Sequence, residues 1–142
     1  MPEMNAEKNQ KELGRACRKY LLASRMASVA EIRDSVLSKR VRYMVFTDNL
    51  QAKEVIIGDG ECRKRYILCY NPKEAHRQQK HRSMTVEVLE KELAKHPDKK
   101  ATAQWAIELL AAKRYRRYLS ISKSGQIQID QGKIRKAEKY DG

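Results

Sequence analysis

Three short apolar runs in the middle of the chain have the composition of β-strands. VRYMVF at residues 41–46, KEVII at 53–57 and RYILCY at 65–70 are rich in β-branched and aromatic residues, which favour extended backbone. The tripeptide Gly-Asp-Gly at 58–60 separates the second run from the third and is typical of a turn. We therefore expect an antiparallel hairpin with a neighbouring strand.

The first 38 residues predict a helix, a strand and a second helix. Asn5 can cap the first helix, and KYLLAS at 19–24 is so short and apolar that it predicts a buried strand. Ser28 and Glu31 have the spacing of a capping box for the second helix. The apolar positions with helical spacing are Ala6, Leu13, Ala16 and Cys17 in the first helix and Val29, Ile32 and Val36 in the second.

A strong helix start follows the third apolar run. Asn71 is a favoured N-cap residue, Pro72 suits the first helical position, and Glu74 lies three residues after the cap. The helix is expected to run from Pro72 to about Lys95 and to pack through Val86, Leu89 and Leu93 in its second half. Its first half is basic nearly all round, as is typical of a helix that faces solvent or a partner.

The last third predicts a helix, two strands and a short helix. Asp98 precedes a stripe formed by Ala103, Ala106, Ile107 and Leu110, and Trp105 is expected to pack in a core or against the preceding helix. KRYRRYLSIS at 113–122 and QIQID at 126–130 have the pattern of paired strands, and Asp130 can cap a basic helix. The predicted fold class is α+β: an antiparallel sheet of about five strands, two longer helices, and the N-terminal helix-strand-helix.

The charge of the chain indicates a polyanionic partner. Lys and Arg total 31 against 18 acidic residues, which gives a net charge of +13 over 142 residues. Nucleic acid is the leading partner class and an anionic membrane surface the second, while a merely solvated basic surface is the alternative. No apolar run reaches the roughly 18 residues of a spanning helix, and no signal-peptide core is present, so a cytoplasmic location is expected.

Basic residues gather in three segments, two of which also contain tyrosines. Lysine and arginine can contact phosphates there, whereas each tyrosine either stacks on bases or packs in the protein. The candidate DNA-binding residues are Arg63, Lys64, Arg65, Arg77, Lys80, Arg82, Lys113, Arg114, Arg116 and Arg117.

Catalytic and metal-binding patterns are missing from the sequence. It has no phosphate-binding glycine loop, no zinc-protease motif and no serine-hydrolase motif, and the spacing of Cys17, Cys62 and Cys69 predicts reduced, buried thiols rather than a zinc site. A small nuclease built on Asp59 or Asp130 is one reading, but turn and cap positions explain both residues. We therefore assign no catalytic residue and no metal ligand to the chain.

The order of several segments resembles the DDE transposases of bacterial insertion sequences. The resemblance covers nearly the whole chain, and its most specific parts are RYILCYNPKEAHR at 65–77 and Ile129-Asp130 followed by Tyr140-Asp141-Gly142. The branch of the family that the chain resembles has a ribonuclease-H-like catalytic domain interrupted by a β-rich insertion. Residues 1–38 would then be a remnant of the catalytic core, and residues 39–142 the insertion region.

The resemblance implies DNA transposition with transposon-end DNA as partner. Three acids in this family hold divalent metal ions, usually magnesium, but none of the three can be placed on this chain, and the Asp-x-Gly expected near Met4–Asn9 is missing. We therefore expect a fragment that is inactive alone, that needs the missing transposase segments, and that contains no cofactor of its own. An independent small module that binds RNA or DNA is the alternative.

Overall fold

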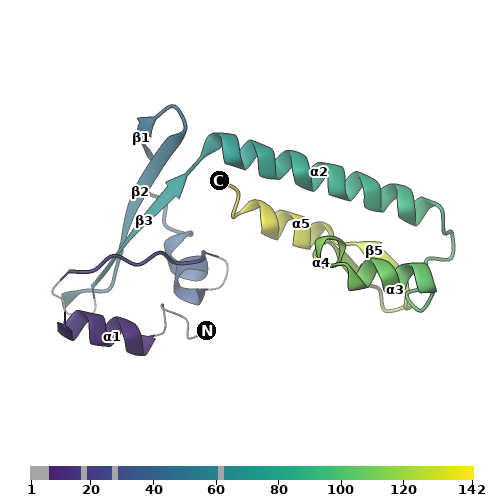
Figure 1. Cartoon of the computed structure of the whole chain (residues 1–142), viewed down its shortest axis with the longest axis horizontal. Helices are drawn as coiled ribbons and strands as arrows, with labels where there is room; N and C mark the ends of the chain where they lie inside the picture. The colour runs from purple at the N-terminus through teal and green to yellow at the C-terminus, as the bar shows by residue number, and fades with distance from the viewer. Residues whose placement is uncertain (1–6, 17–18, 27–28, 61–62) are drawn as a thin grey trace. The chain divides into compact units, whose positions relative to one another are not determined.

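The computed structural model describes residues 7–16, 19–26, 29–60 and 63–142, and the chain forms two compact units (Figure 1). The first unit comprises Met1–Val41 and Val55–Tyr66, and the second comprises Arg42–Glu54 and Ile67–Gly142. The division into a catalytic-core remnant at residues 1–38 and an insertion region at 39–142 was inferred from the resemblance to transposases, and it stays a prediction.

Two helical segments belong to the first unit. Helix α1 spans Glu7–Ala16, as predicted, and the π-helix η1 spans Ile32–Val36 and buries both its end residues. The predicted caps Asn5 and Ser28 lie outside the described residues. The strand predicted at 19–24 was wrong: the backbone there forms no strand, and Leu21 is 91% exposed, so the apolar run has no sheet to join.

The three central runs form one sheet with the order β1-β2-β3, which confirms their predicted association. The strands span Met44–Thr47, Leu50–Ile57 and Lys64–Tyr70. β1 and β2 are antiparallel, with Met44 opposite Ala52 and a register shift between Val45 and Thr47. Cys69 on β3 is an exposed free thiol, which corrects the prediction that it is buried, whereas Cys17 and Cys62 lie outside the described residues.

Helix α2 spans Pro72–Ala94 and begins where the sequence predicts. The Asn71 side chain accepts a hydrogen bond from the Glu74 backbone N–H at 2.9 Å, which satisfies one of the unpaired donors of the first turn. Asn49, in the β1–β2 turn, accepts a second one from the Lys73 N–H at 3.0 Å. The hairpin turn and the start of α2 are therefore joined by a side-chain contact.

The rest of the second unit packs on the far half of α2 (Figure 1). It comprises α3 (Gln104–Ala111), α4 (Lys113–Arg116), β4 (Leu119–Ile121), β5 (Ile127–Ile129) and α5 (Gln131–Glu138). β4 and β5 are antiparallel, with Ser120 opposite Gln128. The core that they form with α2 consists of Leu89, Leu93, Ala106, Tyr118, Leu119 and Ile127.

Three predictions for this region need correction. The strands form a three-stranded and a two-stranded sheet rather than one sheet of about five, because β4 and β5 pair only with each other and pack on the α2 core. Helix α3 begins after Ala103 and not at Asp98, because Lys100 forms a β-bridge with Gln126. The segment 113–116 is helical, a conformation that turns Tyr115 and Tyr118 toward the same core.

Trp105 packs as predicted. Its indole contacts the core of the second unit and stacks on the ring of His96, just after α2, with centroids 4.1 Å apart and planes 6° apart. Within the described residues, no helix is both long and apolar enough to cross a membrane.

The C-terminal residues dock against the start of α2. The Asn71 N–H donates to the Gly142 carbonyl at 2.9 Å, and the Gly142 N–H donates to the Gln78 side chain at 3.1 Å. Asp141 forms an ion pair with Arg82. A Cβ at position 142 would lie 2.5 Å from the Tyr70 ring, so the close approach requires glycine.

Candidate nucleic-acid interface

The predicted basic segment at 113–117 forms an exposed cluster on α4. Four of its five residues are cations, and all four are exposed. The fifth, Tyr115, and the following Tyr118 pack into the core of the second unit, and Tyr118 is only 5% exposed. Because these tyrosines are three residues apart on a helical turn, they point inward together and leave the cations Lys113, Arg114, Arg116 and Arg117 toward solvent.

Two arginines of the cluster lie over these tyrosine rings. The Arg114 guanidinium is 4.4 Å from the centre of the Tyr115 ring, and that of Arg117 is 5.9 Å from the centre of the Tyr118 ring. Each such cation–π contact contributes about 0.5–1 kcal/mol at an exposed site. The tyrosines therefore serve as packing residues that support the arginines rather than as free platforms for bases.

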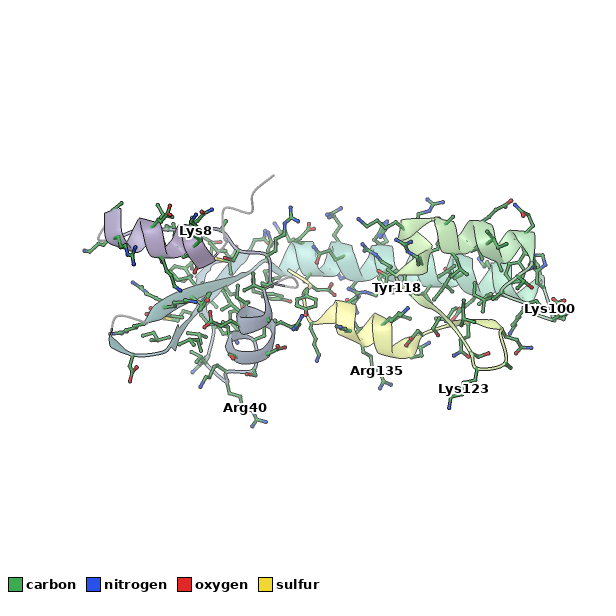
Figure 2. All side chains as sticks on the ribbon, turned by 90° about the horizontal axis from the view of Figure 1, so that it is seen from below. Lys8, Arg40, Lys100, Tyr118, Lys123 and Arg135 are labelled. Carbon is green, nitrogen blue, oxygen red and sulfur yellow. The ribbon has the colours of Figure 1, made fainter. Side chains whose placement is uncertain are left out.

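Helix α5 adds a second group of cations that the sequence-based site prediction left out. The Asp130 N–H donates to the Tyr118 carbonyl at 2.8 Å, and the Lys133 Nζ donates to the Leu119 carbonyl at 2.6 Å. These contacts place the start of α5 beside the segment that follows α4. Figure 2 shows Arg135 extending from α5 on the side away from α2. The signal available in the sequence was the density of cations after the Asp130 cap.

We call the exposed cations of these two groups, taken together and without a claim that they share one face, the α4–α5 basic surface. No member forms an ion pair with an acidic side chain in the part of the chain that the structure describes, and their positive charges are therefore not neutralised there. The surface consists of Lys113, Arg114, Arg116, Arg117, Lys133, Arg135, Lys136 and Lys139.

The first half of α2 carries a separate group of cations. Lys73, Arg77 and Lys80 are exposed, and their helical positions lie opposite the buried face formed by Ala75, Arg82 and Leu89. Arg77 makes two hydrogen bonds to Glu74, at 2.8 and 2.6 Å. This contact raises the pKa of Arg77 and lowers that of Glu74, so both groups stay charged. Their opposite charges cancel, and the pair therefore presents less net charge than Lys80 does.

Arg82 differs from the other candidate cations of α2 because its side chain is buried and paired. It is 6% exposed and forms an ion pair with Asp141, so its guanidinium is not available to a phosphate. Burial opposes its charge, but the Asp141 carboxylate outweighs burial and raises the pKa of Arg82. Its Nε is buried without a hydrogen-bond partner. The basic helix therefore contains one cation with a structural role.

The remaining candidates belong to the first unit. Arg63, Lys64 and Arg65 are exposed near the start of β3. The Lys64 Nζ lies 3.1 Å from the Glu31 carboxylate, which also accepts a hydrogen bond from the Tyr66 hydroxyl. The Tyr66 and Lys64 contacts together lower the pKa of Glu31. The charge of Lys64 is thus partly neutralised by Glu31.

Asp59 and Asp130, the acids of the nuclease reading, each occupy a turn or cap position. Asp130 caps α5 by accepting a hydrogen bond from the Lys133 N–H at 3.1 Å, and Asp59 is exposed in the turn before β3. Within the described residues, no group of three or more His, Cys, Asp or Glu side chains could hold a metal ion. Asp130 therefore has a capping role and Asp59 a turn position, as their places in the sequence indicate.

Comparison of the chain with protein-family models, curated proteins and solved structures gives no match.

Proposed function

We propose that this chain is the DNA-contacting portion of a DDE transposase and that it binds duplex DNA through the α4–α5 basic surface. The observation that carries the proposal is a set of eight exposed cations without acidic partners in the described residues, four from residues 113–117 and four from residues 133–139. The packing of Tyr115 and Tyr118 against the core and the Asp130 cap hold the elements that carry these cations.

Phosphate backbones are the ligand that this arrangement favours. Each neutralised phosphate releases bound counterions, and log K falls with log salt by about 0.9 per contact. If about four of the eight cations contact phosphates at once, affinity falls about 100-fold between 50 and 200 mM salt. Such contacts position a protein on DNA without reading its sequence.

The transposase assignment is supported by the resemblance described above. In the proposed full-length protein, DNA cleavage and joining belong to three acids that lie on other segments and hold magnesium. The chain contributes a surface that contacts transposon-end DNA, and it requires those segments for transposition. The independent binding module remains the second candidate because the second unit has a core of its own.

DNA binding is tested by fluorescence anisotropy with a labelled duplex over a series of salt concentrations. The double variant Lys113→Gln, Arg116→Gln is expected to flatten the salt slope by about 1.8, the value for two lost phosphate contacts. The control is Lys91→Gln, Lys95→Gln, which removes the same charge from lysines that are paired with Glu87 and Glu92. If both doubles changed the slope equally, the surface would have no special role.

The assignment to a transposase has a test of its own. The DNA that flanks the reading frame is sequenced and translated in the same frame. Flanking segments that carry the acids of a DDE site would support a transposase, and intact unrelated genes on both sides would favour the independent module.

A further inference from the structure

We propose that an apolar face of the sheet in the second unit binds the same face of a second copy, so that the chain forms a two-fold dimer. The face is made by side chains on one side of β1, β2 and β3, within the part of these strands that belongs to the second unit. We call it the open sheet face, and it consists of Met44, Leu50, Ala52, Ile67 and Cys69. The inference goes beyond the proposed function, because it does not depend on DNA.

Three side chains identify the opposite face of the sheet. The Lys53 ammonium lies 5.1 Å from the centre of the Tyr43 ring, and the centres of the Tyr43 and Tyr70 rings are 6.0 Å apart. These three side chains therefore share one face. Neighbouring residues of a strand point to opposite faces, so the residues beside these three form the open sheet face, as the pairing of Met44 with Ala52 also requires.

The open sheet face is uncovered although it is apolar. On β3 the exposed Ile67 and Cys69 flank Leu68, which is buried, so only the other side of this strand is covered. Met44 on β1 is also exposed. None of the five residues of the face carries a charge. A contiguous exposed apolar patch of this kind marks an interaction site.

The shape of the face suits an identical face. Ala52 lies on the central strand and is a small, buried side chain, whereas Met44 and Ile67 on the two neighbouring strands are large and exposed. The face is therefore low at its centre and high on both sides. A two-fold interface must be self-complementary, and large side chains of one copy can enter the low centre of the other, as the two sheets of a sandwich interdigitate.

Charge favours a second copy over an anionic partner. The chain carries +13, and the basic surfaces described above lie on α2, α4 and α5. Two copies therefore meet with the least repulsion at a face that has no cation. A polyanion or an anionic membrane would instead select the basic surfaces, because the open sheet face offers no group that pairs with a phosphate.

The area of the face is in the range of a weak dimer. Its three large side chains and Phe46, which follows at the register shift of β1, are each about half exposed, and at roughly 200 Å² per residue they expose about 400 Å² of apolar surface per copy. Interfaces are about 57% apolar, so this corresponds to about 700 Å² per partner in all. Stable interfaces begin at about 600 Å² per partner, and association is therefore expected at roughly micromolar concentrations.

Sedimentation equilibrium of the full 142-residue chain, freed of nucleic acid by nuclease treatment, measures the dimer over about 1–300 µM protein. A monomer–dimer equilibrium is expected that tightens as salt is raised, because salt screens the repulsion between two chains that each carry +13. DNA binding has the opposite salt dependence. A chain that stayed monomeric throughout, or a dimer that salt weakened, would overturn the proposal.

Matched variants locate the interface. Ile67→Ser is expected to raise the dissociation constant of the dimer at least ~10-fold, whereas Ile121→Ser on β4 is expected to leave it unchanged. The two isoleucines are 54% and 56% exposed, so neither substitution opens a cavity in a core. Met44→Gln and Met84→Gln form a second such pair, at 60% and 58% exposed. Equal effects within either pair would overturn the proposal.

The exposed thiol of Cys69 gives a second readout. Its alkylation by iodoacetamide, followed at this residue by peptide mass spectrometry, is expected to slow at least ~5-fold when most of the protein is dimeric. A dimer formed through another face would leave the rate unchanged and would overturn the proposal. Binding of a monomer to phosphatidylserine vesicles that Ile67→Ser abolished would overturn it in favour of a membrane surface.

Discussion

Arg82 and Asp141, 59 residues apart in sequence, form an ion pair that fixes the end of the chain against α2. The Arg82 side chain is 7% exposed and that of Asp141 is 18% exposed, so the arginine has lost more of its hydration. Leaving a buried charge without its partner lowers the stability of the fold. Removing Asp141 and removing Arg82 are therefore expected to lower the free energy of unfolding by different amounts.

Asp141→Asn is expected to lower the free energy of unfolding by about 3 kcal/mol, because the buried Arg82 charge loses its partner. Arg82→Met is expected to cost less, since the carboxylate left behind is better hydrated. Chemical denaturation of both variants measures the difference. A larger loss for Arg82→Met than for Asp141→Asn would contradict this account.

Arg82→Met is also expected to leave the salt slope of DNA binding unchanged, since the guanidinium does not reach the surface. Lys80→Gln, two residues earlier on the exposed face of α2, is expected to flatten the slope by about 0.9, the value for one phosphate contact made outside the α4–α5 basic surface. Arg77→Gln is expected to have a smaller effect because Glu74 already pairs with Arg77. Anisotropy titrations of the three variants measure the change in salt slope for each. Equal changes in all three would show that the exposed face of α2 does not contact DNA.

The stability of the first unit is expected to depend on pH through Glu31. The Tyr66 hydroxyl and Lys64 hold the folded-state pKa of Glu31 below the ordinary value of 4.5. The stabilisation is therefore fully present above about pH 4.5 and is lost as pH falls through the lower folded-state pKa.

Tyr66→Phe removes the larger of the two contacts that favour the charged form of Glu31. It is therefore expected to make the free energy of unfolding fall less steeply as the pH is lowered below about 4.5, the part of the pH profile called the acid limb below. Urea unfolding at a series of pH values, with carboxyl NMR of Glu31, measures the stability and the pKa together. Glu31→Gln provides the comparison, because it removes the titrating group. An acid limb of the same slope in the wild type and in Tyr66→Phe would show that the contact does not set the pKa.

Leu89→Ala is expected to lower the free energy of unfolding by about 3 kcal/mol, since the side chain is fully buried in the core of the second unit and its truncation leaves a cavity. The neighbouring Val88 is 48% exposed, and Val88→Ala is expected to change the stability by less than about 0.5 kcal/mol. Thermal denaturation of both variants gives the comparison. Similar losses would mean that the core lies elsewhere.

Local signals in the sequence predicted the parts of the fold that depend on neighbouring residues. Asn71, Pro72 and Glu74 marked the start of α2 correctly because a cap is made within three residues. Asp130 marked α5 for the same reason. The strand prediction for 113–116 was wrong because Tyr115 packs on distant residues, and that packing selects a helical turn over an extended strand.

The candidate site could be predicted only in part. Exposure follows from composition for most lysines and arginines, which is why the α4 cluster was found. The burial of Arg82 depends on a carboxylate 59 residues away, and no local pattern indicates it. Helix α5 joins the surface through backbone contacts at Tyr118 and Leu119, which are visible only once the chain is folded.

The stack of His96 on Trp105 gives the protein a selective optical reporter. Trp105 is the only tryptophan in the chain and packs, partly buried, against the core of the second unit. Its fluorescence therefore reports melting of that unit alone, whereas far-ultraviolet circular dichroism registers both. Any temperature gap between the two melting curves would measure how independently the units unfold.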